Sequence, residues 1–168
     1  VSYTVIHWWE NANDNEYSYH ESETLRGFTG ATTNATAKSY RINGKTCKND
    51  NTSGYPFTAQ EIQQVTIAGD GSTIVNVYYD RAEYTIKFYQ RISSGVWRPQ
   101  ITWTEFTQYR ITAKYGAYIS DKWPVREDGS RWALEKNGSQ WQNNIDVMGL
   151  GDAEYYQPEQ SGSLREVE

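Results

Sequence analysis

Two histidines are the first residues in this sequence whose type and spacing suggest chemistry. A chain reversal at the turn-forming pair Asn13–Asp14 would place His7 opposite His20 on neighbouring strands. The same hairpin carries three carboxylates: Glu10, Glu21 and Glu23. Paired imidazoles can hold a transition metal. A polar pair on a hairpin is the simpler interpretation, so we expect neither a metal site nor a cofactor.

The motifs of common enzymes do not occur in the sequence. There are 21 Asp and Glu residues, but a glycosidase needs two carboxyl groups facing each other across a cleft, and a small repeat leaves little room for one. No Gly-x-Ser-x-Gly, Walker loop or His-Glu-x-x-His motif is found. Cys47, the single cysteine, is interpreted as a partly exposed loop thiol. We therefore expect no catalytic residues and no enzymatic activity.

Aromatic residues are the most informative side chains. The chain contains 7 Trp and 14 Tyr, yet only 37% of its residues are hydrophobic. Large rings can fill the thin core of a small β domain or form an exposed platform for sugar rings. Trp8 and Trp9 are adjacent on a predicted strand, so they must point to opposite faces. The candidate ligand or inter-domain surface comprises Trp8, Trp9, Tyr79, Tyr84, Trp97 and Trp103.

Charge and composition exclude several classes of partner. The net charge is -5, so no basic field is available for nucleic acid or for an anionic membrane surface. No run approaches the roughly 20 apolar residues that span a bilayer, so we expect no membrane insertion. One cysteine excludes an intrachain disulfide framework. The chain begins with Val1 and is interpreted as a fragment of a longer protein.

Local patterns predict a mainly β first half. Val1–Trp9 and Tyr17–Leu25 form a strand–turn–strand pattern. The capping-box spacing of Thr58 and Glu61 predicts a short helix over residues 58–64. Val65–Ile67 and Thr73–Tyr79 flank an Asp-Gly turn and predict a second hairpin. The polar segment between Asn43 and Pro56 is expected to be a loop, and its Asn-Asp-Asn run lacks the ligands of a calcium loop.

Three short segments of the first half recur in the second half at nearly constant spacing, which divides the chain into two tandem units. We call each recurrence an echo. Tyr84–Tyr89 echoes Tyr3–Trp8, an offset of 81 (84 minus 3). Thr112–Lys114 and Glu154–Tyr156 echo earlier segments in the same order, at offsets of 76 (112 minus 36) and 77 (154 minus 77). We expect domains over residues 1–81 and 82–156, then a linker over 157–168. The connection between Tyr79 and Tyr84 lacks Gly, Pro and Ser, which predicts a stiff joint.

The second unit has turn signals of its own. Tyr84–Tyr89 and Ile101–Tyr109 are predicted extended segments separated by a loop. Ser120–Trp123 predicts one helical turn ended by Pro124. The Asn137–Gly138 pair lies between two apolar-aromatic runs and predicts a hairpin, because both central residues of a type I′ turn need positive φ.

At this level of detail the chain resembles extracellular repeats of bacterial surface proteins, namely the mucin-binding-protein-like and internalin B-repeat families. In the first unit the resemblance rests on Tyr3–Ile6, Ala35–Tyr40 and Ala68–Arg81. In the second it rests on Tyr84–Tyr89, Ile111–Gly116, Ile119–Pro124, Val147–Leu150 and Tyr155–Tyr156. Those families form small β-grasp modules strung along wall-anchored proteins. The resemblance therefore implies a mainly β fold with short helices (α+β), made of two tandem β-grasp-like domains, and it brings no catalytic residues with it.

The function expected from these observations is that of a non-catalytic stalk and adhesion module on the surface of a Gram-positive bacterium. Its parent protein would be extracellular and anchored in the cell wall. Its partners would be adjacent repeats of the same chain and a surface protein or glycan of a host or neighbouring cell. The alternative is a carbohydrate-binding module that uses exposed Trp. Lys38 and Lys114 recur at matched positions, as Lys–Asn amide links would require, but they are interpreted as solvated strand lysines.

Overall fold

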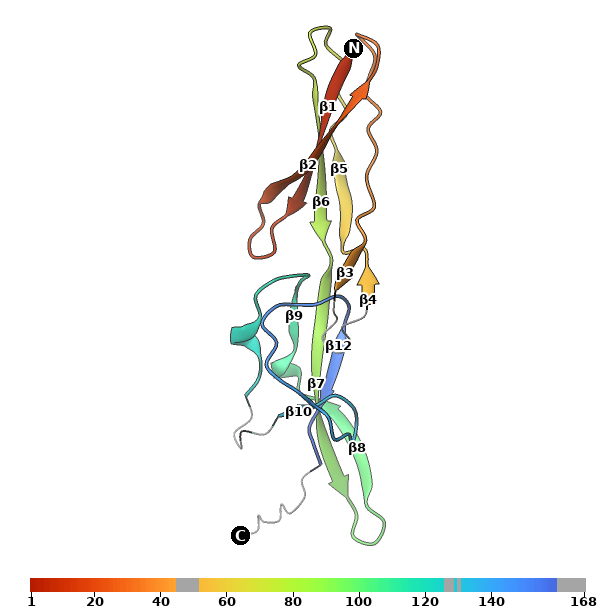
Figure 1. The fold of residues 1–168 in the computed structure, drawn as a ribbon. Coiled ribbons are helices and arrows are strands. Elements are labelled where there is room, and N and C mark those ends of the chain that lie inside the picture. Colours follow the sequence, from red (N-terminus) through yellow and green to blue (C-terminus); the bar gives the residue numbers. More distant parts are fainter. Residues whose placement is uncertain (45–51, 126–128, 130, 160–168) are drawn as a thin grey trace. The chain divides into compact units, whose positions relative to one another are not determined.

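A computed structural model describes residues 1–44, 52–125, 129 and 131–159 of the chain (Figure 1). The structure is mainly β, as the sequence predicts. It divides into two compact units. Unit 1 comprises Val1–Asn43 and Ser53–Ala82, and the main segment of unit 2 begins at Glu83. Cys47 and the Asn-Asp-Asn run at 49–51 lie outside the described residues.

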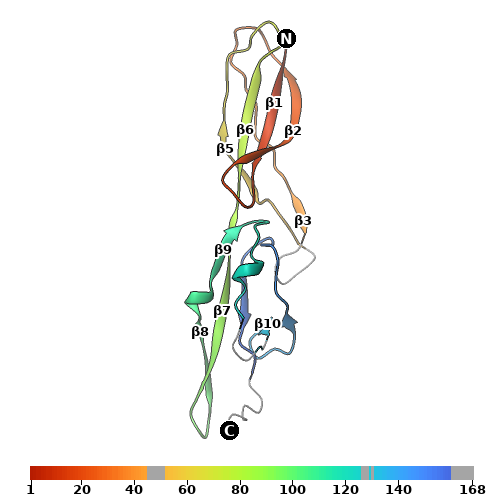
Figure 2. The same cartoon turned by 90° about the vertical axis from the view of Figure 1, so that its left-hand side faces the viewer.

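Unit 1 is built on a four-stranded sheet in which the first and last strands of the unit are neighbours. β1 (Ser2–Glu10) pairs antiparallel with β2 (Tyr17–Arg26) on one side and parallel with β6 (Ile74–Arg81) on the other. β5 (Phe57–Ile62) pairs antiparallel with the far side of β6. The strand order is therefore β2-β1-β6-β5 (Figures 1 and 2).

Alternation of side chains gives this sheet an inner face and an outer face. Tyr3, Val5 and His7 of β1 are buried, as are three alternate residues of β6: Val75, Val77 and Tyr79. Because successive side chains on a strand point to opposite sides, these residues share one face. The coil that follows β2 lies along this inner face, where Thr33 and Ala35 are buried. The core of unit 1 is therefore closed by a coil.

Two predictions for unit 1 are wrong. Residues 58–64 do not form a helix, and Val65–Ile67 is not the partner of β6. The partner is β5, while residues 65–67 exchange backbone hydrogen bonds with the coil, such as the 2.8 Å bond from the Thr33 amide to the Val65 carbonyl. A capping box stabilises a helix only locally, and a helix this short is marginal without an apolar face to bury. Strand pairing buries Phe57 and satisfies the free edge of β6.

The segment expected to be a loop contains two short strands. β3 (Ile42–Gly44) and β4 (Thr52–Gly54) form a two-stranded sheet of their own. The polar composition of the surrounding residues hides this pairing, because strands of three residues carry almost no alternation signal.

Unit 2 repeats the arrangement of first and last strands. β7 (Glu83–Ser94) pairs antiparallel with β8 (Gln100–Glu105) and with β9 (Ile111–Lys114), and it pairs parallel with β12 (Ala153–Tyr156). β12 in turn pairs antiparallel with β10 (Trp132–Ala133), which carries β11 (Trp141–Gln142) at the edge of the sheet. Thus, in both units, the first strand lies between its hairpin partner and the parallel last strand.

The core of unit 2 is aromatic. Ile86 and Phe88 of β7 are fully buried against Trp132 and Tyr155. The Phe88 ring contacts three further rings, with centroid separations of 4.9 Å to Trp123, 4.8 Å to Trp132 and 5.8 Å to Tyr155. Rings of this size fill a thin core with few residues. Packing therefore explains Trp123 and Trp132, the two tryptophans of this core.

Two local predictions for unit 2 are confirmed. A single 3-10 turn, η2 (Ser120–Lys122), precedes Pro124, and a second one, η1 (Thr107–Tyr109), follows β8. β10 and β11 form the hairpin predicted around Asn137. Its turn differs in detail from type I′, because Asn137 adopts a positive φ of 55° and Gly138 does not. The Gly138 amide instead donates to the Glu135 carbonyl at 3.0 Å.

Candidate functional site

Four aromatic side chains gather on the outer face of unit 1. Trp8 lies on the side of β1 opposite to the buried residues, directly across from Tyr19 of β2 and Tyr78 of β6. Residues paired in this way share a face of the sheet. Tyr17 of β2 contacts the Tyr78 ring, with centroids 5.1 Å apart. We call this group, Trp8, Tyr17, Tyr19 and Tyr78, the outer aromatic cluster.

The rings of the cluster form a corner. Trp8 and Tyr78 lie in nearly parallel planes, 19° apart, with centroids separated by 6.2 Å. Tyr19 stands almost perpendicular to Trp8, at 87° and the same separation of 6.2 Å. Tyr19 is also the most open member, with 58% of its surface exposed. The outer face therefore offers an exposed phenol ring beside an indole.

Polar side chains hold these rings in place. The Trp8 indole N–H donates to Asn76 Oδ1 at 2.8 Å, and the Tyr19 hydroxyl lies 3.1 Å from Ser22 Oγ. The Tyr17 hydroxyl donates to Asp80 and accepts a hydrogen bond of 3.4 Å from Gln60. The bond to Asp80 is the main reason why the pKa of Tyr17 rises to about 12. The phenol therefore stays protonated at neutral pH.

Trp9 lies on the inner side of the same sheet. Its indole is sandwiched between His20, at 3.5 Å and 9°, and Phe57, at 3.8 Å and 16°. Tyr40 meets it edge-on with centroids 5.0 Å apart. The Trp9 indole nitrogen is buried without a hydrogen-bond partner. Trp8 and Trp9 thus face opposite sides of the sheet, and only Trp8 belongs to the open face.

His7 and His20 are not paired. A bulge between His7 and Trp8 shifts the register of the hairpin, so that His7 lies opposite Glu21. The two ring nitrogens of His7 are satisfied inside the unit, with Nδ1 2.7 Å from the Tyr79 hydroxyl and Nε2 2.6 Å from Glu23 Oε2. Within the described ranges, no group of three or more His, Cys, Asp or Glu side chains is arranged to hold a metal ion.

The other residues predicted for a ligand or inter-domain surface are dispersed. Tyr79 is fully buried, and its hydroxyl accepts a hydrogen bond from the Lys38 amide, so it packs the interior of unit 1. Tyr84 packs partly buried against the core of unit 2. Trp97 is 93% exposed after β7, whereas Trp103 of β8 contacts the Tyr156 ring edge-on at 5.5 Å. Within unit 1, Trp8, Trp9 and Tyr79 do not share one open face.

Sequence reasoning missed Tyr17, Tyr19 and Tyr78. The strong signal in this region was the Trp8–Trp9 pair, which does not identify strand partners. Tyr78 becomes a neighbour of Trp8 only because β1 and β6 pair in parallel across a separation of about 70 residues along the chain. Alternation in the Tyr-Ser-Tyr segment at 17–19 was the available signal for the other two.

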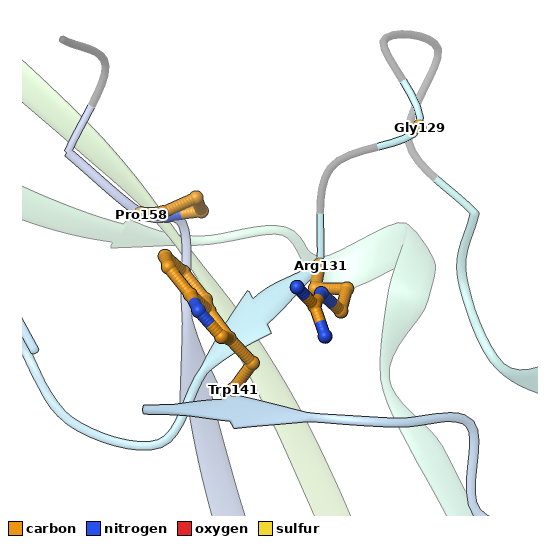
Figure 3. A pocket seen from close by; sticks show the side chains of 4 residues that line it. All are labelled: Gly129, Arg131, Trp141 and Pro158. Carbon is orange, nitrogen blue, oxygen red and sulfur yellow. The ribbon is translucent and has the colours of Figure 1, made fainter. Parts of the chain in front are cut away.

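Unit 2 contains a shallow cavity beside its edge hairpin. Its volume is about 330 Å³, and Gly129, Arg131, Trp141 and Pro158 line it (Figure 3). The Arg131 guanidinium lies 5.8 Å from the centroid of the Trp141 ring, within the range of a cation–π contact. The Trp141 side chain is 41% exposed.

Comparisons with family models, with curated proteins and with solved structures return no match. In the part of the chain that the structure describes, no helix combines the length and the apolar character needed to cross a bilayer. The function must therefore be inferred from the geometry of each unit.

Proposed function

We propose that the chain is a non-catalytic, load-bearing tandem repeat of a bacterial cell-surface protein, acting as a stalk and adhesion module. The observation that carries this proposal is the parallel pairing of first and last strands in each unit. In unit 1, Thr4–Trp9 pairs with Ile74–Tyr79. In unit 2, Ile86–Tyr89 pairs with Ala153–Tyr156. The extracellular setting is supported by the sequence resemblance described above.

Parallel pairing decides how a unit responds to tension. When the chain is pulled from both ends, force enters unit 1 at the start of β1 and leaves it at the end of β6. These two points lie at opposite ends of a parallel pair, so the strands are sheared past each other. Shear loads all the hydrogen bonds between the strands together, whereas peeling an antiparallel hairpin breaks them one at a time. The arrangement therefore suits a segment that must transmit tension.

The strand order also supports assigning both units to the β-grasp type. Each begins with a hairpin and returns so that its last strand lies parallel beside the first, with an earlier strand antiparallel beyond it, β5 in unit 1 and β10 in unit 2. One residue, Ala82, separates the end of β6 from the start of β7, so tension passes from one unit to the next with almost no intervening chain.

Single-molecule force extension of the whole chain tests this function. We expect two unfolding events, each releasing on the order of 250 Å of chain, because each unit spans roughly 75–80 residues at up to 3.6 Å per residue. The parallel pair of unit 2 is the shorter of the two, so unit 2 should give way first. Gradual extension without distinct events would overturn the proposal.

A second function, carbohydrate binding, is favoured by the outer aromatic cluster. Aromatic rings exposed on a sheet mark binding surfaces in soluble proteins. Adhesion to a glycan is compatible with the load-bearing role, because a stalk that holds a cell in place must also attach. A glycan-array screen of the whole chain tests this function, and a complete lack of bound glycans would count against it.

A further inference from the structure

We propose that the outer aromatic cluster binds an uncharged pyranose ring, seated in the corner between Trp8 and Tyr19. This inference rests on the second function proposed above and assigns its site and the class of sugar. The C–H face of a pyranose is apolar, so it packs on an aromatic ring as another ring would. The 87° angle between Trp8 and Tyr19 provides a surface to stack on and a wall beside it.

The polar groups around the corner suit sugar hydroxyls. Each hydroxyl can both donate and accept a hydrogen bond. Around the rings lie an amide at Asn76, another at Gln60, a hydroxyl at Ser22 and a carboxylate at Asp80. Pockets for small ligands combine apolar area with a few placed polar groups in this way. The outer face has both the apolar rings and the polar side chains that bond to them.

Charge at the corner selects against acidic sugars. Among the described residues, the polar side chains that bond to the cluster are Asn76, Asp80, Ser22 and Gln60, which carry no positive charge. The Asp80 carboxylate accepts the hydrogen bond of the Tyr17 hydroxyl, and Glu10 lies opposite Tyr17 in the β1–β2 register, so two carboxylates lie close to the cluster. The nearby guanidinium of Arg81 lies over the Phe57 ring, which belongs to the inner side, and its Nε donates to the Glu10 carbonyl at 2.6 Å. A uronic acid or sulfated sugar would meet like charge here, whereas a neutral hexose would not.

The cluster is also ordered before any ligand arrives. Trp8 is fixed by its bond to Asn76, and Tyr17 by bonds to Asp80 and Gln60. Side chains that are already held in one conformation lose little entropy on binding. This matters for a weak ligand such as a monosaccharide unit, whose total binding free energy is small.

The test titrates the whole chain with cellohexaose, chitohexaose and maltohexaose as neutral probes and with an oligogalacturonate as the acidic probe. Binding is followed by backbone amide chemical shifts. We expect at least one neutral probe to saturate, with shifts concentrated around residues 8, 19 and 78. The oligogalacturonate should bind at least about 10-fold more weakly, as expected for like charges at short range. A tighter complex with the acidic probe would overturn the inference.

Variants assign the binding to the corner. Tyr19→Ala removes the most exposed ring. It should lower the affinity for the neutral probe about 5–10-fold, the range expected for the loss of one aromatic contact. Trp8→Phe keeps an aromatic ring at this position and should lower the affinity for the neutral probe less than Trp8→Ala does. Trp97→Ala is the matched control, because it removes an exposed indole elsewhere and should leave affinity unchanged.

The results of the titrations and of the glycan array distinguish an error in the assigned site from an error in the proposed carbohydrate-binding function. If a neutral probe binds but Tyr19→Ala and Trp8→Ala leave its affinity unchanged, the site assigned here is wrong while carbohydrate binding stands. If no probe saturates the protein at concentrations up to about 10 mM, and the glycan array also shows no bound glycan, then both the assigned site and the carbohydrate-binding function are wrong. Thermal unfolding of each variant identifies any loss of binding that comes from loss of fold.

Discussion

His7 is fully buried in unit 1, between the Tyr79 hydroxyl at 2.7 Å and the Glu23 carboxylate at 2.6 Å. A buried imidazole is tolerated when both of its nitrogens have partners. Its counterpart in unit 2 is Phe88, since both residues occupy the buried position opposite the last strand of their unit. The same place in the fold is therefore filled by a polar network in one unit and by a ring stack in the other.

Replacing His7 tests that network. His7→Ala should lower the free energy of unfolding of unit 1 by about 2–4 kcal/mol, because it opens a cavity and leaves the Tyr79 hydroxyl without one partner. His7→Phe restores the volume and should cost less than His7→Ala. Urea denaturation followed by circular dichroism gives both values. Equal losses for the two variants would contradict this account of the buried histidine.

Acid sensitivity should arise at Glu21. The Tyr40 hydroxyl donates a 2.6 Å hydrogen bond to Glu21, and Lys38 lies 3.4 Å away. The hydrogen bond is the main cause that lowers the pKa of Glu21 below its ordinary value, and the Lys38 charge adds to it. A carboxylate whose pKa is depressed by folding stabilises the folded state above its unfolded pKa of about 4.3, and this stability is lost as pH falls through the folded pKa.

Tyr40→Phe removes the bond to Glu21 and should raise the pKa of that carboxyl. The loss of stability between pH 7 and pH 3 should consequently be smaller in the variant than in the parent. Side-chain carboxyl shifts measured across a pH series report the pKa directly, and denaturation midpoints at the two pH values report the stability. An unchanged Glu21 pKa in Tyr40→Phe would refute the role given to Tyr40.

At the scale of elements, one glutamine fastens the coil of unit 1 to its sheet. Gln64 Oε1 accepts hydrogen bonds from the Thr33 hydroxyl at 2.7 Å and from the Ala35 amide at 3.1 Å. Its Nε2 donates to the Ala35 carbonyl at 2.7 Å. The side-chain amide thus pairs with the coil much as another strand would, and it satisfies a backbone that the sheet does not reach.

Gln64→Ala should therefore loosen the coil. We expect a loss of about 1–3 kcal/mol, because the buried Ala35 backbone is left unsatisfied. Hydrogen exchange at the Ala35 amide should accelerate more than exchange within β1. Gln63→Ala is the matched control, because the side chain of this neighbouring glutamine bonds to Glu61 and Asn76 at the exposed surface. Similar exchange at Ala35 in both variants would show that Gln64 has no special role.

The elements with local signals could be predicted from sequence, and those that depend on distant pairing could not. The hairpins β1–β2 and β10–β11 follow from alternation and turn residues, and both are present. The sequence predicts a helix where β5 lies, because a capping box is a local signal, whereas the edge of β6 with which β5 pairs cannot be recognised from sequence. The residue-level register of β1–β2 failed at a single bulge, which turn residues alone do not reveal.

The segments that recur in the two units also predict the strand correspondence only in part. Buried partners of the first strands are Val77, opposite His7, and Tyr155, opposite Phe88, so the last strands correspond at an offset of 78 (155 minus 77). The Tyr-Tyr echo has an offset of 77 (154 minus 77), and a slip of one residue exchanges the two faces of a strand. The Thr-Ala-Lys echo matches a coil in unit 1 to β9 in unit 2. Of the candidate site, Trp8 was found and its three partners were not.

At the scale of the whole molecule, the described part of the chain holds two sets of buried residues, one in each unit. Tyr3, Val5 and Val77 belong to the core of unit 1, whereas Ile86, Phe88 and Trp132 belong to that of unit 2. Separate cores predict separate cooperative transitions. Phe88→Ala should destabilise unit 2 by about 3–5 kcal/mol and should leave unit 1 nearly unchanged.

Native-state hydrogen exchange resolves the two cores in one experiment. In Phe88→Ala, protection should fall throughout β7 and β12 while β1 and β6 keep their parent rates. In His7→Ala the pattern should be reversed. If either variant lowers protection in all four strands equally, the chain unfolds as one cooperative body and the description as two units is incorrect.

The most direct test of the load-bearing role compares two directions of pulling on the same protein. With Cys47 replaced by Ser, handles at the two ends of the chain load the parallel pairs of both units in shear. Handles at Ser2→Cys and Arg26→Cys, which lie opposite each other in the β1–β2 register, peel that antiparallel hairpin instead. Pulling from the ends should require clearly higher force per event than peeling. Equal forces in the two directions would contradict the claim that these units are built to carry tension.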